Sequence, residues 1–298
     1  MGISNDQIED LENEIRQIFE QKPHMANLLQ AFAPLFLEKR RWLHKGGETQ
    51  HKFVSDPLKY LEGIPLIRQY ETVLPEDSSW EKAGLAVTGA IREGFPDFGK
   101  DMACLSSWIE DGSLDCSSFF SSSPEEEQHP AQSEDIRVGT EVFGLFKGFL
   151  RRFILTKWAS DNADELASQS WKKGYCPVCG SLPLLAVLRD KGQRWLQCPD
   201  CSFEWQFPRL VCPACDCENP ENTEYMFVEG KKDDTAFICN NCKRYLLTVN
   251  RPGNIQQTSS DILAISLTHL DMILQKKGFL PMVECEWNTF QIPREAEG

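Results

Sequence analysis

Four pairs of cysteines, each with two residues between its members, lie close together in the second half of this 298-residue chain. They hold eight of its twelve cysteines: Cys176 and Cys179, Cys198 and Cys201, Cys212 and Cys215, Cys239 and Cys242. Two intervening residues let both thiolates of a pair turn toward one cation, and two pairs supply the four sulfurs of a tetrahedral site. The eight cysteines therefore predict two metal ions per chain, iron or zinc, since both metals suit four-sulfur sites.

The residues between the pairs indicate which pairs share a metal. Each module reads as strand, turn and strand between its two pairs, followed by one more strand. The expected strands are residues 182–188, 193–197 and 203–207 in the first module, and 223–228, 235–238 and 245–249 in the second. A hairpin returns the second pair of a module to its first pair. Sequential pairing is therefore favoured over interleaved pairing.

Other uses of the cysteines fit the pattern less well. Four vicinal pairs are an unusual disulfide framework for a chain expected to stay in a reducing compartment. A thioredoxin-like motif needs one pair between a strand and a helix of a βαβ unit, and no such unit is indicated. Cys217 follows Cys215 by two residues, and we expect it to be a spare thiol beside the metal, with ligand substitution as the alternative.

The front of the chain predicts an all-helical domain over residues 1–170, with a loop or linker at about 111–135. Apolar residues recur at helical spacing there. The expected helices cover residues 4–22, 25–44, 57–60, 80–91, 102–109 and 138–158. The last of these has the strongest period and indicates a central core helix. Lys147, Arg151 and Arg152 interrupt it too often for a membrane span.

We therefore predict an α+β multidomain protein, with the helical domain followed by two tandem rubredoxin-like or zinc-ribbon modules. The first four-cysteine ribbon covers residues 171–210 and the second covers 211–252. Residues 253–298 form a C-terminal docking helix and tail, with the helix starting at Ser259–Asp261 and ending at Gly278. The tail over residues 280–298 shows no clear period and is expected to be irregular.

Charge narrows the choice of partners. Residues 1–170 carry 17 basic and 29 acidic side chains, whereas residues 171–251 carry 11 and 10. A nucleic-acid-binding protein gains affinity from a basic face, and neither part has the required excess. We expect no nucleic-acid partner.

Targeting segments and catalytic motifs are missing from the sequence, which bears on the location of the protein and on whether it is an enzyme. The start of the sequence has no apolar stretch typical of a signal peptide or membrane span, so we expect a cytoplasmic protein without membrane insertion. No P-loop, Gly-x-Ser-x-Gly or His-Glu-x-x-His motif occurs. We therefore assign no catalytic residues and expect a binding protein rather than an enzyme.

Several motifs of the cysteine-rich part resemble the formate dehydrogenase accessory (FdhE) family. The opening run Trp171–Pro183 is similar to the start of that family's metal domain. Further similar positions are Trp195–Cys198, Cys201, Trp205, Arg209, Tyr245–Leu246, Asp261, Leu270–Asp271, Gly278 and Asn288. Over the helical front the likeness is only architectural. The sequence departs from the pattern at Asp216–Cys217 and at Leu247, where a basic residue would be expected.

The resemblance implies a cytoplasmic assembly factor that binds the catalytic subunit of a formate dehydrogenase and supports its maturation. A rubredoxin-like electron-transfer or redox-sensing protein is one alternative. A zinc-ribbon nucleic-acid adaptor is another, and the charge distribution disfavours it. Whether the protein forms a homodimer is left open.

Client contact is expected on the near-neutral ribbon face, used together with the helical domain. Arg209, Lys243 and Arg244 flank the cysteine pairs and are the candidate partner-binding residues, since they would pair with client carboxylates. We expect Trp195, Phe203 and Trp205 to pack over the metal sites and the module interface instead.

Overall fold

The computed structural model describes residues 5–45, 56–69, 79–120, 138–163, 166, 170–189, 192–228, 231–250 and 259–289. The backbone divides into two compact units. Unit 1 comprises Met1–Val54 and Tyr70–Asp164, and unit 2 comprises Ser55–Gln69 and Glu165–Gly298. The segment 55–69 thus groups with the ribbons, whereas the sequence places it inside a helical domain that runs to residue 170.

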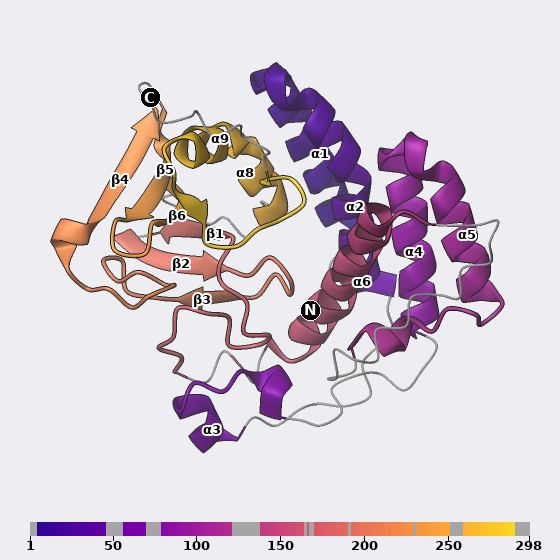
Figure 1. Ribbon diagram of the computed structural model, residues 1–298, viewed down its shortest axis with the longest axis horizontal. Helices are drawn as coiled ribbons and strands as arrows, with labels where there is room; N and C mark the ends of the chain where they lie inside the picture. Colours follow the sequence, from indigo (N-terminus) through magenta and orange to yellow (C-terminus); the bar gives the residue numbers. More distant parts are fainter. Residues whose placement is uncertain are drawn as a thin grey trace. The chain divides into compact units, whose positions relative to one another are not determined.

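Unit 1 is helical, as the apolar periodicity predicts. Its long helices are α1 (Asn5–Gln21), α2 (Ala26–Lys45), α4 (Ser79–Gly94), α5 (Gly99–Glu110) and α6 (Thr140–Asp161) (Figure 1). Helix α6 buries Phe146, Phe149 and Phe153 almost completely, so it is the core helix that its sequence indicates. Helices α2 and α4 approach so closely that a Cβ at Gly94 would lie 1.9 Å from the Ala31 carbonyl oxygen.

Two features of unit 1 lie partly outside the described residues. The expected first helix begins at Ser4, which lies outside the described residues, and the expected loop at 111–135 is described only to residue 120. That part contains a short 3-10 helix, η4 (Cys116–Phe120). None of the described helices is long and apolar enough to cross a membrane.

Unit 2 is built on one sheet that runs through both cysteine modules. Its strands are β1 (Leu185–Arg189), β2 (Gln193–Gln197), β3 (Glu204–Gln206), β4 (Thr223–Val228), β5 (Lys231–Cys239), β6 (Arg244–Asn250) and β7 (Leu280–Pro281). The order is β3-β2-β1-β6-β5-β4, with β7 paired to β6 (Figure 1). The parallel pairing of β1 with β6 sets Leu185 opposite Leu247 and joins the two hairpins. The predicted α+β class is confirmed, and the two ribbons form one continuous sheet.

The C-terminal part differs in detail from the expected single helix and irregular tail. Two helices, α8 (Ser260–Ser266) and α9 (Thr268–Lys276), meet at Leu267. The hydroxyls of Ser266 and Thr268 each donate to a backbone carbonyl three residues earlier, a local bond that competes with regular helix hydrogen bonding. The start of the tail forms β7, which pairs with the start of β6. The sequence pattern of the tail does not predict this strand.

Residues 55–69 belong to unit 2 although they lie far ahead of its ribbons in the sequence. They contain α3 (Pro57–Leu61) and the 3-10 helix η2 (Leu66–Gln69). Asp56 caps α3 as its Asp-Pro signature predicts, and its side chain accepts from the Leu58 and Lys59 amides. The backbone amide of Leu66 donates to the Pro177 carbonyl at 2.8 Å. This segment therefore lies directly on the first cysteine pair.

Candidate metal centres

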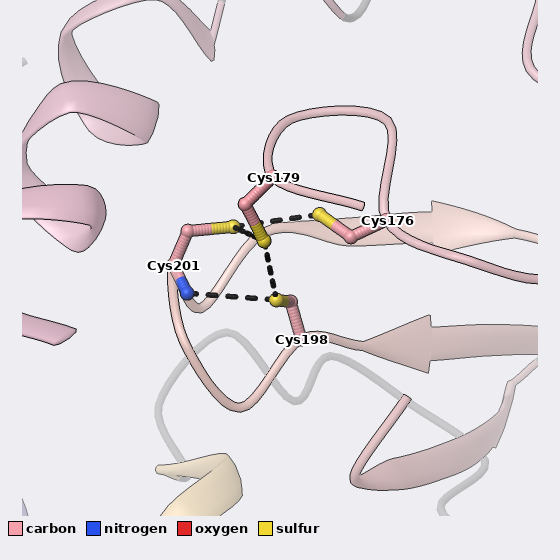
Figure 2. Close-up of side chains that lie close together, drawn as sticks. All are labelled: Cys176, Cys179, Cys198 and Cys201. Carbon is pink, nitrogen blue, oxygen red and sulfur yellow. Dashed lines mark hydrogen bonds between the residues drawn. The ribbon is translucent and has the colours of Figure 1, made fainter. Parts of the chain in front are cut away.

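The structure brings the eight cysteines together in two groups of four, and the pairing is sequential. In each group the four sulfurs lie within 4.8 Å of one another. The first cluster comprises Cys176, Cys179, Cys198 and Cys201, and the second comprises Cys212, Cys215, Cys239 and Cys242. Figure 2 shows the four sulfurs of the first cluster turned toward one another from two loops that flank the β1–β2 hairpin.

The sulfur separations fit a tetrahedral metal ion. Four sulfurs at a zinc–sulfur distance of about 2.3 Å stand about 3.8 Å apart. In the first cluster Cys179 Sγ lies 3.3 Å from Cys198 Sγ and 3.8 Å from Cys201 Sγ. In the second, Cys212 to Cys242 and Cys215 to Cys239 both measure 3.7 Å. Both donor sets therefore suit a metal that four thiolates bind.

All four cysteine pairs share one backbone geometry. The residue after the second cysteine of each pair has a positive φ, 85° at Gly180, 56° at Ser202, 53° at Asp216 and 57° at Lys243. Three of these are not glycine, and a non-glycine residue in the left-handed region costs free energy that its surroundings must offset. Four repeats of this conformation indicate that the four loops are built for the same task.

Backbone amides point at the sulfurs in both clusters. The Val178 amide donates to Cys176 Sγ at 3.4 Å, and the Cys201 amide donates to Cys198 Sγ at 3.5 Å. In the second cluster the Cys217 and Arg244 amides donate to Cys215 and Cys242. Such bonds favour the thiolate form, which is the form that binds metal.

The clusters differ in burial. All four cysteines of the first cluster are buried, whereas Cys215 and Cys242 of the second are half-exposed. The cover over the first cluster includes the buried Tyr60 of α3, whose pKa is raised by burial and by the charge of Cys176. The second cluster thus has half-exposed ligands, whereas the ligands of the first lie buried under this α3–η2 cover.

Acid–base behaviour follows from the crowding of the sulfurs. Hydrogen bonds from Cys176, Cys198 and Cys201 hold the pKa of Cys179 well below its usual value, while burial raises the pKa of Cys198 and Cys201. At Cys215 burial acts to raise the pKa, but hydrogen bonds, first that from Asn241, lower it to about 7. A metal ion that recruits all four thiolates must therefore displace protons in both clusters.

Cys217 does not belong to either four-sulfur group. Its backbone carbonyl accepts from the Cys212 amide at 3.0 Å, and its own sulfur accepts from Asn222 Nδ2 at 3.7 Å. Its backbone thus shapes the second cluster while its half-exposed thiol stands outside it. This placement favours the spare-thiol interpretation.

The three candidate partner-binding cations each contact a different neighbour. Arg209 is exposed and stacks on Tyr225, with its Cζ 5.3 Å from the ring centre. Lys243 is exposed, and its Nζ lies 5.6 Å from the ring centre of Phe279. Arg244 is half-buried and donates to the Pro281 carbonyl at 2.8 Å, which fastens β7 to the second cluster. Arg209 and Lys243 are thus the more available to a partner.

The aromatic residues expected to pack inward do so unequally. Trp205 is buried, and its indole donates to the Lys173 carbonyl at 3.2 Å. Trp195 and Phe203 are only half-buried, and the Arg189 guanidinium lies 5.2 Å from the Trp195 ring. The sequence reasoning missed Arg194, a fully buried cation next to Trp195. The signal was the alternation of the strand, which places Arg194 on the same face as the buried Leu196.

Known proteins match part of this chain by sequence and nearly all of it by fold. A family model described as FdhE, central domain, matches residues 175–209. A protein named FdhE homolog from Aquifex aeolicus is 29% identical over 119 residues, which are 38% of this chain and 41% of that protein. Another from Cronobacter sakazakii is 29% identical over 129 residues, which are 41% of this chain and 39% of that protein.

These matches span about two fifths of the length of the curated relatives. The crystal structure of the FdhE protein from Pseudomonas aeruginosa has the same fold, with a TM-score of 0.60 and 19% identity over 94% of this chain and 95% of that one. The family model, the relatives and the shared fold thus confirm the resemblance to the FdhE family that the ribbon residues indicate.

Proposed function

We propose that this protein is a cytoplasmic accessory factor that binds the catalytic subunit of a formate dehydrogenase during its maturation. The observation that carries the proposal is the pair of four-cysteine clusters set in an FdhE-type fold. The protein acts by binding and not as an enzyme, because four thiolates complete a tetrahedral shell and leave no coordination position for a substrate.

Each cluster holds one iron or zinc ion in this proposal. The eight ligands are Cys176, Cys179, Cys198 and Cys201 in the first site and Cys212, Cys215, Cys239 and Cys242 in the second. When bound, the ions supply cross-links between loops that are distant in sequence, and such binding contributes directly to folding. The ribbons thereby become a rigid platform for a protein partner.

The docking surface that we propose combines cations with exposed apolar side chains. Arg209 is followed by Leu210, which is 55% exposed. The carbonyl of Lys243 accepts from the amide of Leu280, which is 53% exposed. Arginine is enriched among the few residues that dominate the binding energy of protein interfaces, and exposed apolar side chains gain free energy when they are buried there. A client face of acidic and apolar side chains would therefore bind to this surface more favourably than to the acidic helical unit.

Affinity capture of the full-length chain from cells growing on formate, with mass spectrometry of the retained proteins, tests the function. The catalytic subunit of a formate dehydrogenase should be enriched. Arg209→Glu should weaken its capture while metal content and melting temperature stay unchanged. Arg16→Glu is the same charge reversal at an exposed position of α1 and is the matched control. It should leave capture of the catalytic subunit unchanged. Capture of nucleic-acid-bound proteins instead would overturn the proposal.

One observation favours a second function, electron transfer or redox sensing. Cys215 and Cys242 are half-exposed, so an iron ion at the second site would lie near the surface, where electrons exchange readily. Anaerobically purified protein that shows a reversible visible absorbance change on reduction would support this function. A colourless protein containing zinc would leave only the structural role.

A further inference from the structure

One cation is buried inside the ribbon sheet, and no carboxylate of the described residues pairs with it. Arg194 of β2 is 1% exposed, and its Cζ lies 5.2 Å from the ring centres of both Phe207 and Phe237. Phe207 follows β3 of the first ribbon, whereas Phe237 belongs to β5 of the second. The guanidinium is therefore enclosed by aromatic rings from the two ribbons.

The same guanidinium holds the connection between the ribbons. Its Nη2 donates to the backbone carbonyls of Pro208 and Val211. Val211 immediately precedes Cys212, the first cysteine of the second cluster. A side chain of the first ribbon thus fixes the chain at the entrance to the second metal site.

The charge of Arg194 is not neutralised by a carboxylate among the described residues. Its Nε and Nη1 are buried and have no hydrogen-bond acceptor there. Burial lowers its pKa to about 10, so it remains a cation at neutral pH. Arg194 interacts with Tyr225 both by charge and through a side-chain hydrogen bond, and with Cys212 and Arg209 by charge. Of these, Arg209 is a second cation, and only Cys212 becomes an anion when metal binds.

We propose that Arg194 supplies the positive charge that compensates the second four-cysteine metal site, so that the sheet of the first ribbon tunes metal retention in the second. A divalent ion with four thiolates carries a net charge of about −2, and a buried charge is costly unless an opposite charge accompanies it. Metal binding at Cys212 would satisfy both partners at once. The inference rests on the proposed occupancy of both clusters.

Two substitutions separate charge from hydrogen bonding. Arg194→Lys keeps a cation and a donor, whereas Arg194→Gln keeps a donor without charge. Zinc-loaded protein is mixed with a chromogenic chelator, and the release phase that Cys215→Ala abolishes is assigned to the second site. We expect Arg194→Gln to accelerate that phase by about tenfold or more and Arg194→Lys by much less, with the other phase unchanged. Arg189→Gln is the control, because Arg189 pairs with Glu204, and it should leave the second-site phase unchanged.

Iron-loaded protein gives a readout of charge that a purely structural role would not move. Loss of a nearby cation should favour the ferric site, and a tenfold shift in the ferric-to-ferrous ratio corresponds to about 59 mV. Arg194→Gln should lower the potential of one site and Arg194→Lys should not. If the lysine and glutamine variants behave alike, Arg194 acts through geometry alone and the inference is wrong.

Two further results keep this test separate from that of the function. Wild-type protein with fewer than two metals per chain would contradict the proposed occupancy itself. Two metals together with unaltered release in Arg194→Gln would contradict only the role of Arg194. Arg194→Met replaces Arg194→Gln if the glutamine variant is insoluble.

Discussion

The two cysteine clusters share one loop design and differ in what covers them. Each is built from two loops, every loop has a residue with positive φ after its second cysteine, and backbone amides donate to sulfurs in both clusters. The first is sealed by residues 57–69, which come from more than one hundred positions earlier in the chain. The second leaves Cys215 and Cys242 half-exposed. A ribbon motif thus sets the donor geometry, while distant packing decides whether the site is closed to solvent.

The largest expected effect comes from removing one ligand of each cluster. Cys176→Ala should eliminate the metal of the sealed cluster, and with it binding free energy on the order of 10 kcal/mol. Both cysteine loops of this cluster and the α3–η2 cover depend on that metal. Cys215→Ala should also lose one metal but keep more soluble protein, since the second cluster has fewer buried surroundings. Soluble yield and melting temperature measure the difference. If both variants lose the same soluble yield and melting temperature, the two clusters contribute equally to stability and the predicted difference between them is wrong.

Aromatic packing offers a second comparison of the ribbons. Trp205 of the first ribbon is buried, so Trp205→Ala should lower the free energy of unfolding by about 3–5 kcal/mol. Tyr225 of the second is half-buried and meets Phe237 edge-on, so Tyr225→Ala should cost only about 1–2 kcal/mol. Denaturant unfolding at fixed metal content tests both. Unchanged stability of Trp205→Ala with lost client capture would instead place Trp205 on the binding surface.

The second ribbon also carries a pH-sensitive contact. Asp271 of α9 is buried and accepts a hydrogen bond of 2.6 Å from the Tyr245 hydroxyl of β6. Burial raises its pKa from 3.8 to about 7, although the Tyr245 bond opposes this. Because the folded state binds the proton more tightly, the stabilisation is complete below about pH 4 and is lost as pH rises through 7.

Between pH 5.5 and 8 the loss should be about 2 kcal/mol, and Asp271→Asn should remove this pH dependence. Unfolding of wild type and variant across this range, with metal content checked at each pH, gives the comparison. A wild-type curve as flat as that of Asp271→Asn would show that the carboxyl group stays ionised.

The smallest expected effect is the order of metal release. The half-exposed second site should release zinc to a chelator about tenfold faster than the sealed site. This rate ratio corresponds to a difference of about 1.4 kcal/mol in the activation free energy of release. Cys176→Ala and Cys215→Ala identify the slow and fast phases. Release of both ions in a single phase would mean that the α3–η2 cover gives no protection.

The parts of the molecule that depend on local pattern are predictable from sequence. Cysteine spacing and hairpin composition give the grouping of the sulfurs, and residues 223–228 form β4 as expected. Apolar periodicity gives the helices of unit 1, including α2 with Pro34 inside it. Each of these signals lies within one element or one turn.

Contacts between distant segments leave no such signal. The bond from Leu66 to Pro177 joins backbone groups, which have the same chemistry in every residue, so no side chain announces it. The parallel pairing of β1 with β6 likewise requires two ribbons to meet edge to edge. Strand alternation places Arg194 on the same face as Leu196, but the contact of Arg194 with Phe237 of the second ribbon has no local signal. The sealed first cluster and the charged setting of the second are therefore properties of the folded chain.

The measurement that tests the account most directly is the metal content of anaerobically purified protein. Elemental analysis should find two iron or zinc ions per wild-type chain, and one ion in Cys176→Ala or Cys215→Ala protein. Each variant would then retain the ion of its intact cluster. A wild-type chain that carries one ion or none would contradict the two-site account.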